Sequence, residues 1–262
     1  LVAEYARDRR MMLSLLPLPA LGPQNAEFEL LLARGFHSGA QMAFNDRYIV
    51  RLDPSEDVQR KSFSQNWRRQ LAKAEKAGLS FERATPDRLP EFHALYDRMV
   101  DRKGFEDRSA YHETIGPLMA MASDALRPEL FLVSEGGDVI AGAIIFKAGD
   151  RAVYLYGATL DRALPLRAGY MLHWHIIGWL RQHTSARWYD LGGTDGFAGL
   201  HQFKIGMVGD TGLVSPVPPT ANYAAYRLPF LLGEAAFGAR DVIQKFKARM
   251  LERRHKAEAE RT

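Results

Sequence analysis

A lysine near the C-terminal end of the chain stands among apolar residues. In the stretch YDLGGTDGFAGLHQFKIGMVGD, residues 189–210, Lys204 lies between Phe203 and Ile205. A charged residue in such surroundings usually has a partner for its charge. The ammonium group could neutralise a diphosphate or stabilise charge that develops on a carbonyl oxygen. A lysine whose apolar stem lies along the surface, with its charge in water, is the alternative interpretation.

The segment in front of Lys204 is rich in glycine and poor in charge. Gly192 and Gly193 follow the β-type run RWYDL. Glycine lets backbone amides approach a ligand closely, so this loop could receive a phosphate or an oxyanion. Asp190, at the end of the run, could orient an incoming amine or accept its proton, and it could equally cap the turn through the backbone. Lys204, Asp190 and Gly193 are therefore candidate site residues.

Other catalytic chemistries have less support. The chain contains no cysteine, which excludes disulfides, thiolate nucleophiles and cysteine-ligated metal sites. It also lacks a G-x-S-x-G nucleophile motif, so direct transfer between two bound substrates is favoured over a covalent intermediate. His173 and His175 lie two residues apart on a predicted helix and cannot chelate one ion well. His183 and His201 have no partner at ligand spacing, so we expect no metal site and assign all four histidines structural or surface roles.

The elements that must position these residues follow from the hydrophobic pattern. Residues 55–78, 87–104 and 109–125 predict three helices, and ELFLVS, VIAGAIIFKA and RAVYLYGAT predict three strands. The links Gly136-Gly137 and Gly149-Asp150 are short enough for hairpins, so these strands form an antiparallel meander. A long helix over residues 167–183 and the run RWYDL come next. This order predicts a mixed α/β (α+β) fold, and no Rossmann or Walker glycine motif is present.

Composition is that of a globular protein with a basic C-terminal tail. Hydrophobic residues make up 47% of the 262 residues and charged residues 25%. Residues 240–262 hold eight Lys/Arg and four Asp/Glu, a surplus of 8 − 4 = +4 that equals the net charge of the whole chain. This tail could meet tRNA, phospholipid or an acidic partner, or be a solvated helix end. No apolar run approaches the roughly 20 residues that span a bilayer.

Four stretches together resemble the FemAB (Fem/peptidoglycan-bridge) aminoacyltransferases of the GCN5-related N-acyltransferase (GNAT) superfamily. They are SQNWRRQLAKAEKAGL, RKGFEDRSAYH, YLYGATLDRALPLRAGYMLHWHIIGWL and YDLGGTDGFAGLHQFKIGMVGD, and they cover residues 54–215 almost continuously. The resemblance implies a GNAT-like, largely antiparallel sheet flanked by helices. It implies that residues 1–53 are the C-terminal part of a first GNAT-like domain, residues 54–222 the second, acyltransferase domain, and residues 223–262 helices that return to the first.

The resemblance also implies an activity. Members of this family transfer an amino acid from aminoacyl-tRNA to an amine of a peptidoglycan precursor, without a metal ion or other cofactor. For this chain it implies an aminoacyltransferase acting on such a precursor or a similar phosphate-bearing acceptor. Its partners would be aminoacyl-tRNA and that acceptor. Its place would be the cytoplasm, with peripheral contact at the inner face of the membrane.

Site residues carry over from the family by position. Lys204 and Phe203 match the Phe-Lys motif, which is implicated in acceptor binding and the transfer step. Arg108 matches a phosphate-binding arginine, and Tyr156 a tyrosine that lines the acceptor groove, with Tyr111 beside them. The family's basic helix, a candidate tRNA or phosphate contact, corresponds to Arg68, Arg69, Lys73 and Lys76.

Two other functions stay open. An acyl-CoA-dependent N-acyltransferase of envelope polysaccharide or lipid synthesis uses the same fold and usually binds the CoA pyrophosphate through R/Q-x-x-G-x-G/A before a helix. The corresponding DRALPLRAGYML has Leu166 three residues before Gly169, so this motif is not met. The other alternative is a binding module without catalysis. The sequence leaves open the amino acid, the acceptor, the general base and the oligomeric state.

Overall fold

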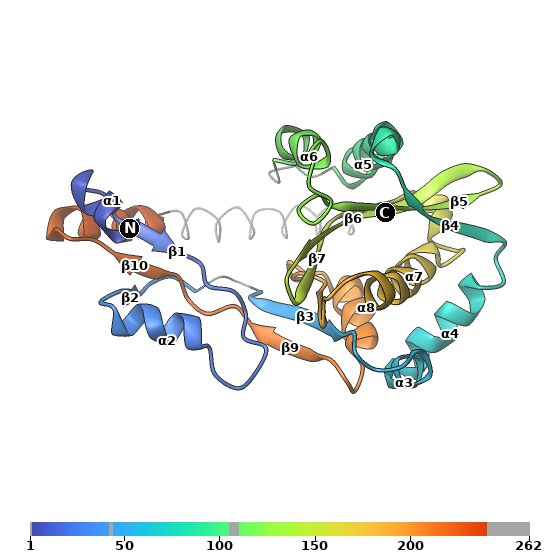
Figure 1. Ribbon diagram of the computed structural model, residues 1–262, viewed down its shortest axis with the longest axis horizontal. Coiled ribbons are helices and arrows are strands. Elements are labelled where there is room, and N and C mark those ends of the chain that lie inside the picture. Colours follow the sequence, from blue (N-terminus) through green and yellow to red (C-terminus); the bar gives the residue numbers. More distant parts are fainter. Residues whose placement is uncertain (1, 42–43, 105–109, 240–262) are drawn as a thin grey trace, which may run out of the picture. The chain divides into compact units, whose positions relative to one another are not determined.

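The structure is a computed structural model that describes residues 2–41, 44–104 and 110–239. The chain divides into two compact units (Figure 1). The smaller unit combines Leu1–Asn45 with Pro216–Thr262, and the larger unit is Asp46–Ser215. The division expected from the sequence grouped residues 46–53 with the remnant of a first domain. In the structure their strand belongs to the sheet of the larger unit.

The smaller unit contains a three-stranded antiparallel sheet. Its order is β1 (Leu13–Leu15), β10 (Ala221–Tyr223) and β2 (His37–Ser38). Helices α1 (Val2–Asp8) and α2 (Ala26–Ala33) belong to the same unit, and residues 227–239 are helical. Pairing of β1 with β10 joins segments from opposite ends of the chain in one sheet.

Seven strands form the sheet of the larger unit, in the order β4-β5-β6-β7-β8-β3-β9. Strands β4 to β7 pair antiparallel, whereas β8 pairs parallel with β7 and antiparallel with β3. The bounds are β3 (Asp46–Arg51), β4 (Leu79–Ala84), β5 (Glu129–Glu135), β6 (Asp138–Ala148), β7 (Arg151–Thr159), β8 (Trp188–Asp190) and β9 (Leu213–Pro216).

Helices cover both faces of this sheet. Figure 1 shows α5 and α6 on one face, and α4, α7 and α8 on the other. Each face has its own hydrophobic core, because side chains alternate along a strand. On β5, Phe131 and Val133 join the α7 core, and Leu130 and Leu132 join the α5 core. The helices are α3 (Glu56–Ser62), α4 (Gln65–Ala74), α5 (Leu89–Lys103), α6 (Tyr111–Met119), α7 (Ala168–His183) and α8 (Ala198–Val208), with 3-10 turns η1 (Pro86–Arg88) and η2 (Asp161–Ala163).

The predicted fold class is confirmed. The three predicted strands form the meander β5-β6-β7, and both hairpin links contain glycines with positive φ. Gly136 has φ 58° and Gly137 φ 94°, a conformation that residues with a side chain rarely adopt. The long helix predicted over residues 167–183 is α7.

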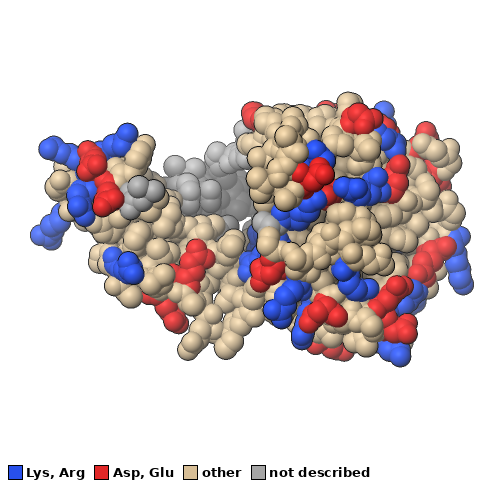
Figure 2. Space-filling view, viewed as in Figure 1, with Lys and Arg blue, Asp and Glu red and all other residues tan. Residues whose placement is uncertain are grey.

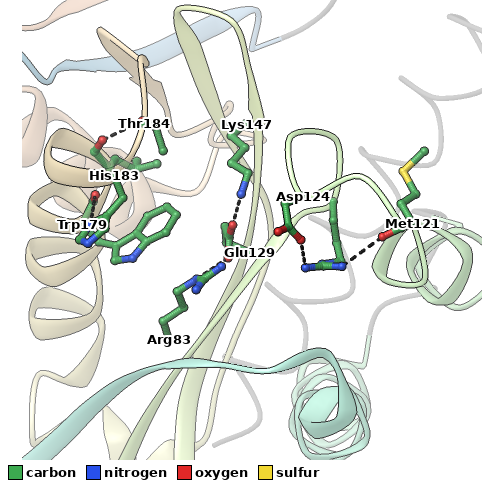
Figure 3. Close-up of polar contacts among 10 residues, drawn as sticks. Arg83, Met121, Asp124, Glu129, Lys147, Trp179, His183 and Thr184 are labelled. Atoms are coloured by element: carbon green, nitrogen blue, oxygen red, sulfur yellow. Dashed lines mark hydrogen bonds and ion pairs between the residues drawn. The ribbon is translucent and has the colours of Figure 1, made fainter.

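An ionic cluster around a buried carboxylate ties three strands to α7. Glu129, 5% exposed at the first residue of β5, accepts a hydrogen bond from Arg83 Nε at 2.6 Å and pairs with Lys147 (Figure 3). Both cations also lie over the indole ring of Trp179, at 5.2 Å and 5.7 Å. Because the one carboxylate is shared by two cations that belong to β4 and β6, the cluster holds the strands together.

The surface of the larger unit mixes both signs of charge. On the face seen in Figure 2, basic and acidic side chains are interspersed. Ion pairs of the larger unit include Arg60 with Glu75 and Arg88 with Glu91. None of the helices in the described part of the chain has both the length and the apolar character needed to cross a bilayer.

Candidate acyl-transfer site

The pairing of strands β7 and β8 ends at Asp190, one of the candidate site residues. Their parallel pairing covers three positions and ends with Val153 opposite Asp190. Strand β8 stops there, whereas β7 continues to Thr159. The edge of β7 from Tyr154 onward therefore has no β8 partner, and the chain after β8 turns through Gly192 and Gly193. The carboxyl ends of neighbouring parallel strands are where open sheets bind ligands.

A bulge in β7 directs two nearby tyrosines to opposite faces of the sheet. Tyr154 and Tyr156 pair with consecutive residues of β6, so Leu155 is an extra residue. Residues two apart on a regular strand point to the same face of the sheet. The extra residue changes this, so that Tyr154 and Tyr156 point to opposite faces. Tyr154 packs against His173 of α7, with ring centroids 4.9 Å apart. Tyr156 packs against Tyr111 of α6, at 4.8 Å.

The carboxylate of Asp190 is occupied by contacts within the protein. Arg47 donates to both of its oxygens at 3.1 Å, and a guanidinium nitrogen of Arg151 lies 3.9 Å away. The N–H of Gly192 donates to Oδ1 at 2.9 Å, which is the turn-capping contact. With Asp190 1% exposed, a role toward an incoming amine stays a prediction.

Lys204 is buried, and its ammonium group clamps the turn after β8. Only 5% of the residue is exposed. Nζ donates to the carbonyl oxygen of Leu191 at 2.6 Å and to that of Gly193. These contacts bring Lys204, Gly193 and Asp190 together around one turn, and the ammonium does not extend into water.

Burial changes the acidity of this lysine. Desolvation, followed by the nearby charge of Arg47, lowers the pKa of Lys204 to about 8, and Asp195 and Asp190 oppose that fall. In the part of the chain that the structure describes, the N–H groups of Gly193 and Thr194 have no hydrogen-bond partner. The turn therefore combines a buried positive charge with unused backbone donors, an arrangement that suits a phosphate or an oxyanion.

Phe203 lies between three helices. Its ring is 4.9 Å from Tyr170 and 5.5 Å from His173, both on α7, and 6.1 Å from Trp67 on α4. The residue is half-buried, so its contacts within the protein position α8 and its neighbour Lys204. A direct contact with substrate stays a prediction.

His173 is a neutral histidine inside the α7 core. Its Nδ1 lies 3.0 Å from the hydroxyl of Tyr189, and 4% of the residue is exposed. Burial, followed by the charge of Lys204, lowers the pKa of His173 to about 3. The structural role that the sequence suggests for this histidine agrees with these contacts.

His201 has a partner that the spacing of the histidines could not reveal. Its Nδ1 lies 2.6 Å from the hydroxyl of Tyr48, a residue of β3 that is 153 positions away along the chain. Tyr48 is buried and His201 exposed. His201 lies on the same helix as Lys204, and the backbone of Tyr48 bonds to the same turn.

The candidate residues on the opposite face form a separate group. The Tyr156 hydroxyl lies 3.4 Å from Thr114 Oγ1 on α6. Tyr111 is 1% exposed, and burial raises the pKa of its hydroxyl. The structure thus unites Tyr111 with Tyr156, away from the face that Lys204 occupies. Arg108 lies outside the described residues.

The basic helix α4 is joined to α8. The N–H of Ser64 donates to the carbonyl of Gly206 at 2.9 Å, and a Cβ on Gly206 would lie 2.8 Å from Ser64 Oγ and 3.2 Å from Trp67 Cδ1. Such close approach requires glycine at this position. The helix that carries Lys204 is thereby fixed against the start of α4.

The four cations of α4 and its C-terminal extension differ in what they contact. Arg68 donates to the carbonyls of Lys61 and Phe63, so it closes the link from α3. Arg69 donates to Asn66 at 2.9 Å. Arg69, Lys73 and Lys76 are exposed and available to an anionic partner.

Comparisons with known proteins match this description. The sequence model of the acetyltransferase (GNAT) domain family matches residues 61–204. FemX has a similar structure, with a TM-score of 0.70 and 18% identity, covering 86% of this chain and 74% of that one. The C-terminal domain of a protein described as a lysylphosphatidylglycerol synthetase from Agrobacterium fabrum follows with a TM-score of 0.58, 13% identity, and coverage of 89% and 75%.

L-PGS from Bacillus licheniformis has a TM-score of 0.53 and 15% identity, with coverage of 81% and 69%. At these identities the likeness shows the fold. No curated protein matches the chain.

Proposed function

The chain belongs to the acetyltransferase (GNAT) domain family, and we propose that this acyltransferase moves an amino acid from aminoacyl-tRNA to an amine. The acceptor is a peptidoglycan precursor or a similar phosphate-bearing molecule, and the product is an amide. The observation that carries the proposal is the position of Lys204. Its buried ammonium holds the turn after β8, at the point where β7 and β8 separate.

The chemistry suits this turn. An aminoacyl ester is already activated, so the protein must mainly hold two substrates together and stabilise the oxyanion of the tetrahedral intermediate. The N–H groups of Gly193 and Thr194 supply donors, and the ammonium of Lys204 bonds to the carbonyl of the same Gly193. The amine attacks the carbonyl carbon, the C–N bond forms, and the ester C–O bond breaks as the ribose oxygen leaves.

The surface of α4 supports tRNA as the donor. Arg69, Lys73 and Lys76 are exposed, and α4 is fixed to α8 through Gly206. Cations on such a face bind a phosphate backbone without reading its sequence. A tRNA held there lies against the helix that carries Lys204.

Acyl-CoA is the alternative donor, because the family name refers to acetyl transfer. The loop before α7, where GNAT proteins bind the CoA pyrophosphate, does not fit that group well. Pro165 has no N–H, and the N–H groups of Leu164 and Arg167 already donate to Asp161 and Leu164. Few backbone donors are left for a pyrophosphate, which favours the tRNA donor.

The test is a transfer assay with two donors. The protein is incubated with an amine acceptor and either labelled aminoacyl-tRNA or labelled acetyl-CoA, using nucleotide-linked and lipid-linked cell-wall precursors as acceptors. We expect amide product from aminoacyl-tRNA, and a fall of about 10²-fold or more in Lys204→Met. Lys61→Met, which removes an exposed lysine of α3, is the matched control. Product from acetyl-CoA alone would establish the alternative, and acceptor binding without product from either donor would indicate a non-catalytic module.

A further inference from the structure

A histidine–tyrosine pair lies one helical turn from Lys204. The Tyr48 hydroxyl is 2.6 Å from Nδ1 of His201, and the two rings meet edge to face with centroids 5.7 Å apart. Tyr48 is 2% exposed, whereas His201 is exposed. A buried phenol therefore fixes the imidazole through one nitrogen, while the ring itself stays accessible.

The pair borders the same turn as Lys204. His201 precedes Lys204 by three residues on α8, a spacing that places side chains on one side of a helix with Cβ atoms about 5–6 Å apart. The backbone of Tyr48 bonds to Leu191 and Gly192, and Lys204 Nζ donates to the carbonyl of the same Leu191. Tyr48 and Lys204 therefore both contact the turn that carries the unused N–H groups.

The tautomer of His201 decides which of its ring nitrogens can accept a proton. Burial raises the pKa of the Tyr48 hydroxyl, and a hydrogen bond with Thr194 opposes that rise. In the tautomer that carries its proton on Nδ1, this N–H donates to the Tyr48 oxygen. That arrangement leaves Nε2 of the imidazole unprotonated and able to accept a proton.

We propose that His201 is the general base of the transfer and that Tyr48 is its positioning residue, an inference that rests on the proposed aminoacyl transfer. The acceptor amine attacks the ester carbonyl and the C–N bond forms. Nε2 of His201 takes the proton that the nitrogen releases. The ester C–O bond then breaks, and the departing ribose oxygen takes that proton back from the imidazolium. No further reactant is needed.

The other ionisable groups at this corner are less suited to the role. Asp190 is occupied by Arg47 and the turn, and Lys204 donates to two carbonyls. The charges that act near the pair are Lys204 on α8, Asp195 in the loop, and Asp46 and Arg47 on β3. His201 combines exposure, an oriented ring and a position beside the turn.

The test compares His201→Asn with the wild-type protein in the aminoacyl-tRNA assay. Asparagine keeps a polar group at the place of Nδ1, so it can still bond to Tyr48, and it has no group at the place of Nε2. We expect kcat to fall about 10²-fold or more with little change in KM, and the acid limb of the pH–rate profile to disappear. Imidazole added to His201→Ala restores part of the rate, which a purely structural role would not allow.

Two further variants complete the design. Tyr48→Phe should also lower kcat, but by less. The imidazole of His201 can still accept a proton in this variant, but the Tyr48 hydroxyl no longer holds it in place. His183→Asn, an exposed histidine of α7, should retain the wild-type rate and pH profile. Thermal melting of each variant separates lost catalysis from lost folding, and His201→Gln serves if His201→Asn does not fold.

The outcomes separate the base from the overall function. If the wild-type protein is active and His201→Asn has the same kcat and the same acid limb, the assignment of His201 is wrong and the proposed function stands. If the wild-type protein forms no amide from aminoacyl-tRNA with any acceptor, the proposed function is wrong and the base assignment falls with it.

Discussion

The ammonium nitrogen of Lys204 lies 2.6 Å from the carbonyl oxygen of Leu191, so a buried cation and the turn after β8 form one structural unit. An ammonium group makes three hydrogen bonds at most, and two of them are used within this turn. Any role of Lys204 in binding or transfer therefore acts through a charge that is held in place before substrate arrives.

The buried charge of Lys204 should make stability depend on alkaline pH. The pKa of Lys204 is about 8 in the folded protein and 10.5 without burial, so the unfolded chain binds more protons between these values. The free energy of unfolding should therefore rise from pH 8 to 10.5 by about 3 kcal/mol from this group. Urea unfolding of the wild-type and Lys204→Met proteins at several pH values measures this rise. Other lysines and tyrosines titrate in both proteins, so the difference between the two pH dependences isolates Lys204. Equal slopes in the two proteins would contradict it.

Contact between α8 and α4 should not tolerate a side chain at residue 206. Gly206→Ala places a Cβ 2.8 Å from Ser64 Oγ, so we expect the free energy of unfolding to fall by about 1–3 kcal/mol. Gly199→Ala on the same helix is the control. Nothing lies within 4 Å of its Cβ, so helix propensity alone should stabilise the protein by up to about 1 kcal/mol. Destabilisation by both substitutions would show that packing on α4 is not the cause.

Asp190→Asn should destabilise the protein because it leaves a buried ion pair incomplete. Arg47 is 31% exposed and Asp190 1%, so part of the arginine charge stays in water and we expect a loss of roughly 2 kcal/mol. The exposed pair of Arg51 and Asp53 on the neighbouring segment is the control. Asp53→Asn should change the free energy of unfolding by less than about 1 kcal/mol. Chemical denaturation at pH 7 compares the two.

Protonation of His173 should weaken the fold on the acid side. Its pKa is about 3 in the folded protein and 6.5 when unperturbed, so the unfolded chain binds the extra proton in between. Above pH 6.5 His173 makes its full contribution to the free energy of unfolding. This contribution is lost progressively as the pH falls toward 3. His173→Asn should flatten the pH dependence of the melting temperature between pH 6.5 and 4.5. A curve for the variant that parallels the wild type would refute this assignment.

Charge reversal on α4 should reduce the salt dependence of tRNA binding. Each phosphate contact that is lost lowers the slope of log K against log salt by about 0.7–0.9. Lys73→Glu/Lys76→Glu should therefore flatten the slope by more than one unit and weaken binding. Arg34→Glu/Arg227→Glu, two exposed arginines of the smaller unit, is the charge-matched control. Identical slopes for the two double variants would exclude α4 as the contact.

Periodicity and glycine position were sufficient to predict the strands of the meander and the long helix α7. They could not predict contacts between distant segments. Asp190 reads as a free carboxylate in the sequence, because its partner Arg47 lies 143 residues away. The contact between Tyr48 and His201 could not be predicted for the same reason. The bulge at Leu155, which turns Tyr154 and Tyr156 to opposite faces of the sheet, also leaves no sign in the residue pattern.

Because of the extra residue in β7, the face to which each of its side chains points depends on how the strand is paired with β6. A slip of one position turns side chains from one face of a strand to the other. If a ligand on either face pulled β7 straight against β6, the tyrosine on the far side of Leu155 would have to exchange one helical layer for the other. Binding of a ligand on one face of the sheet would then be coupled to the helices on the other face through the bulge at Leu155.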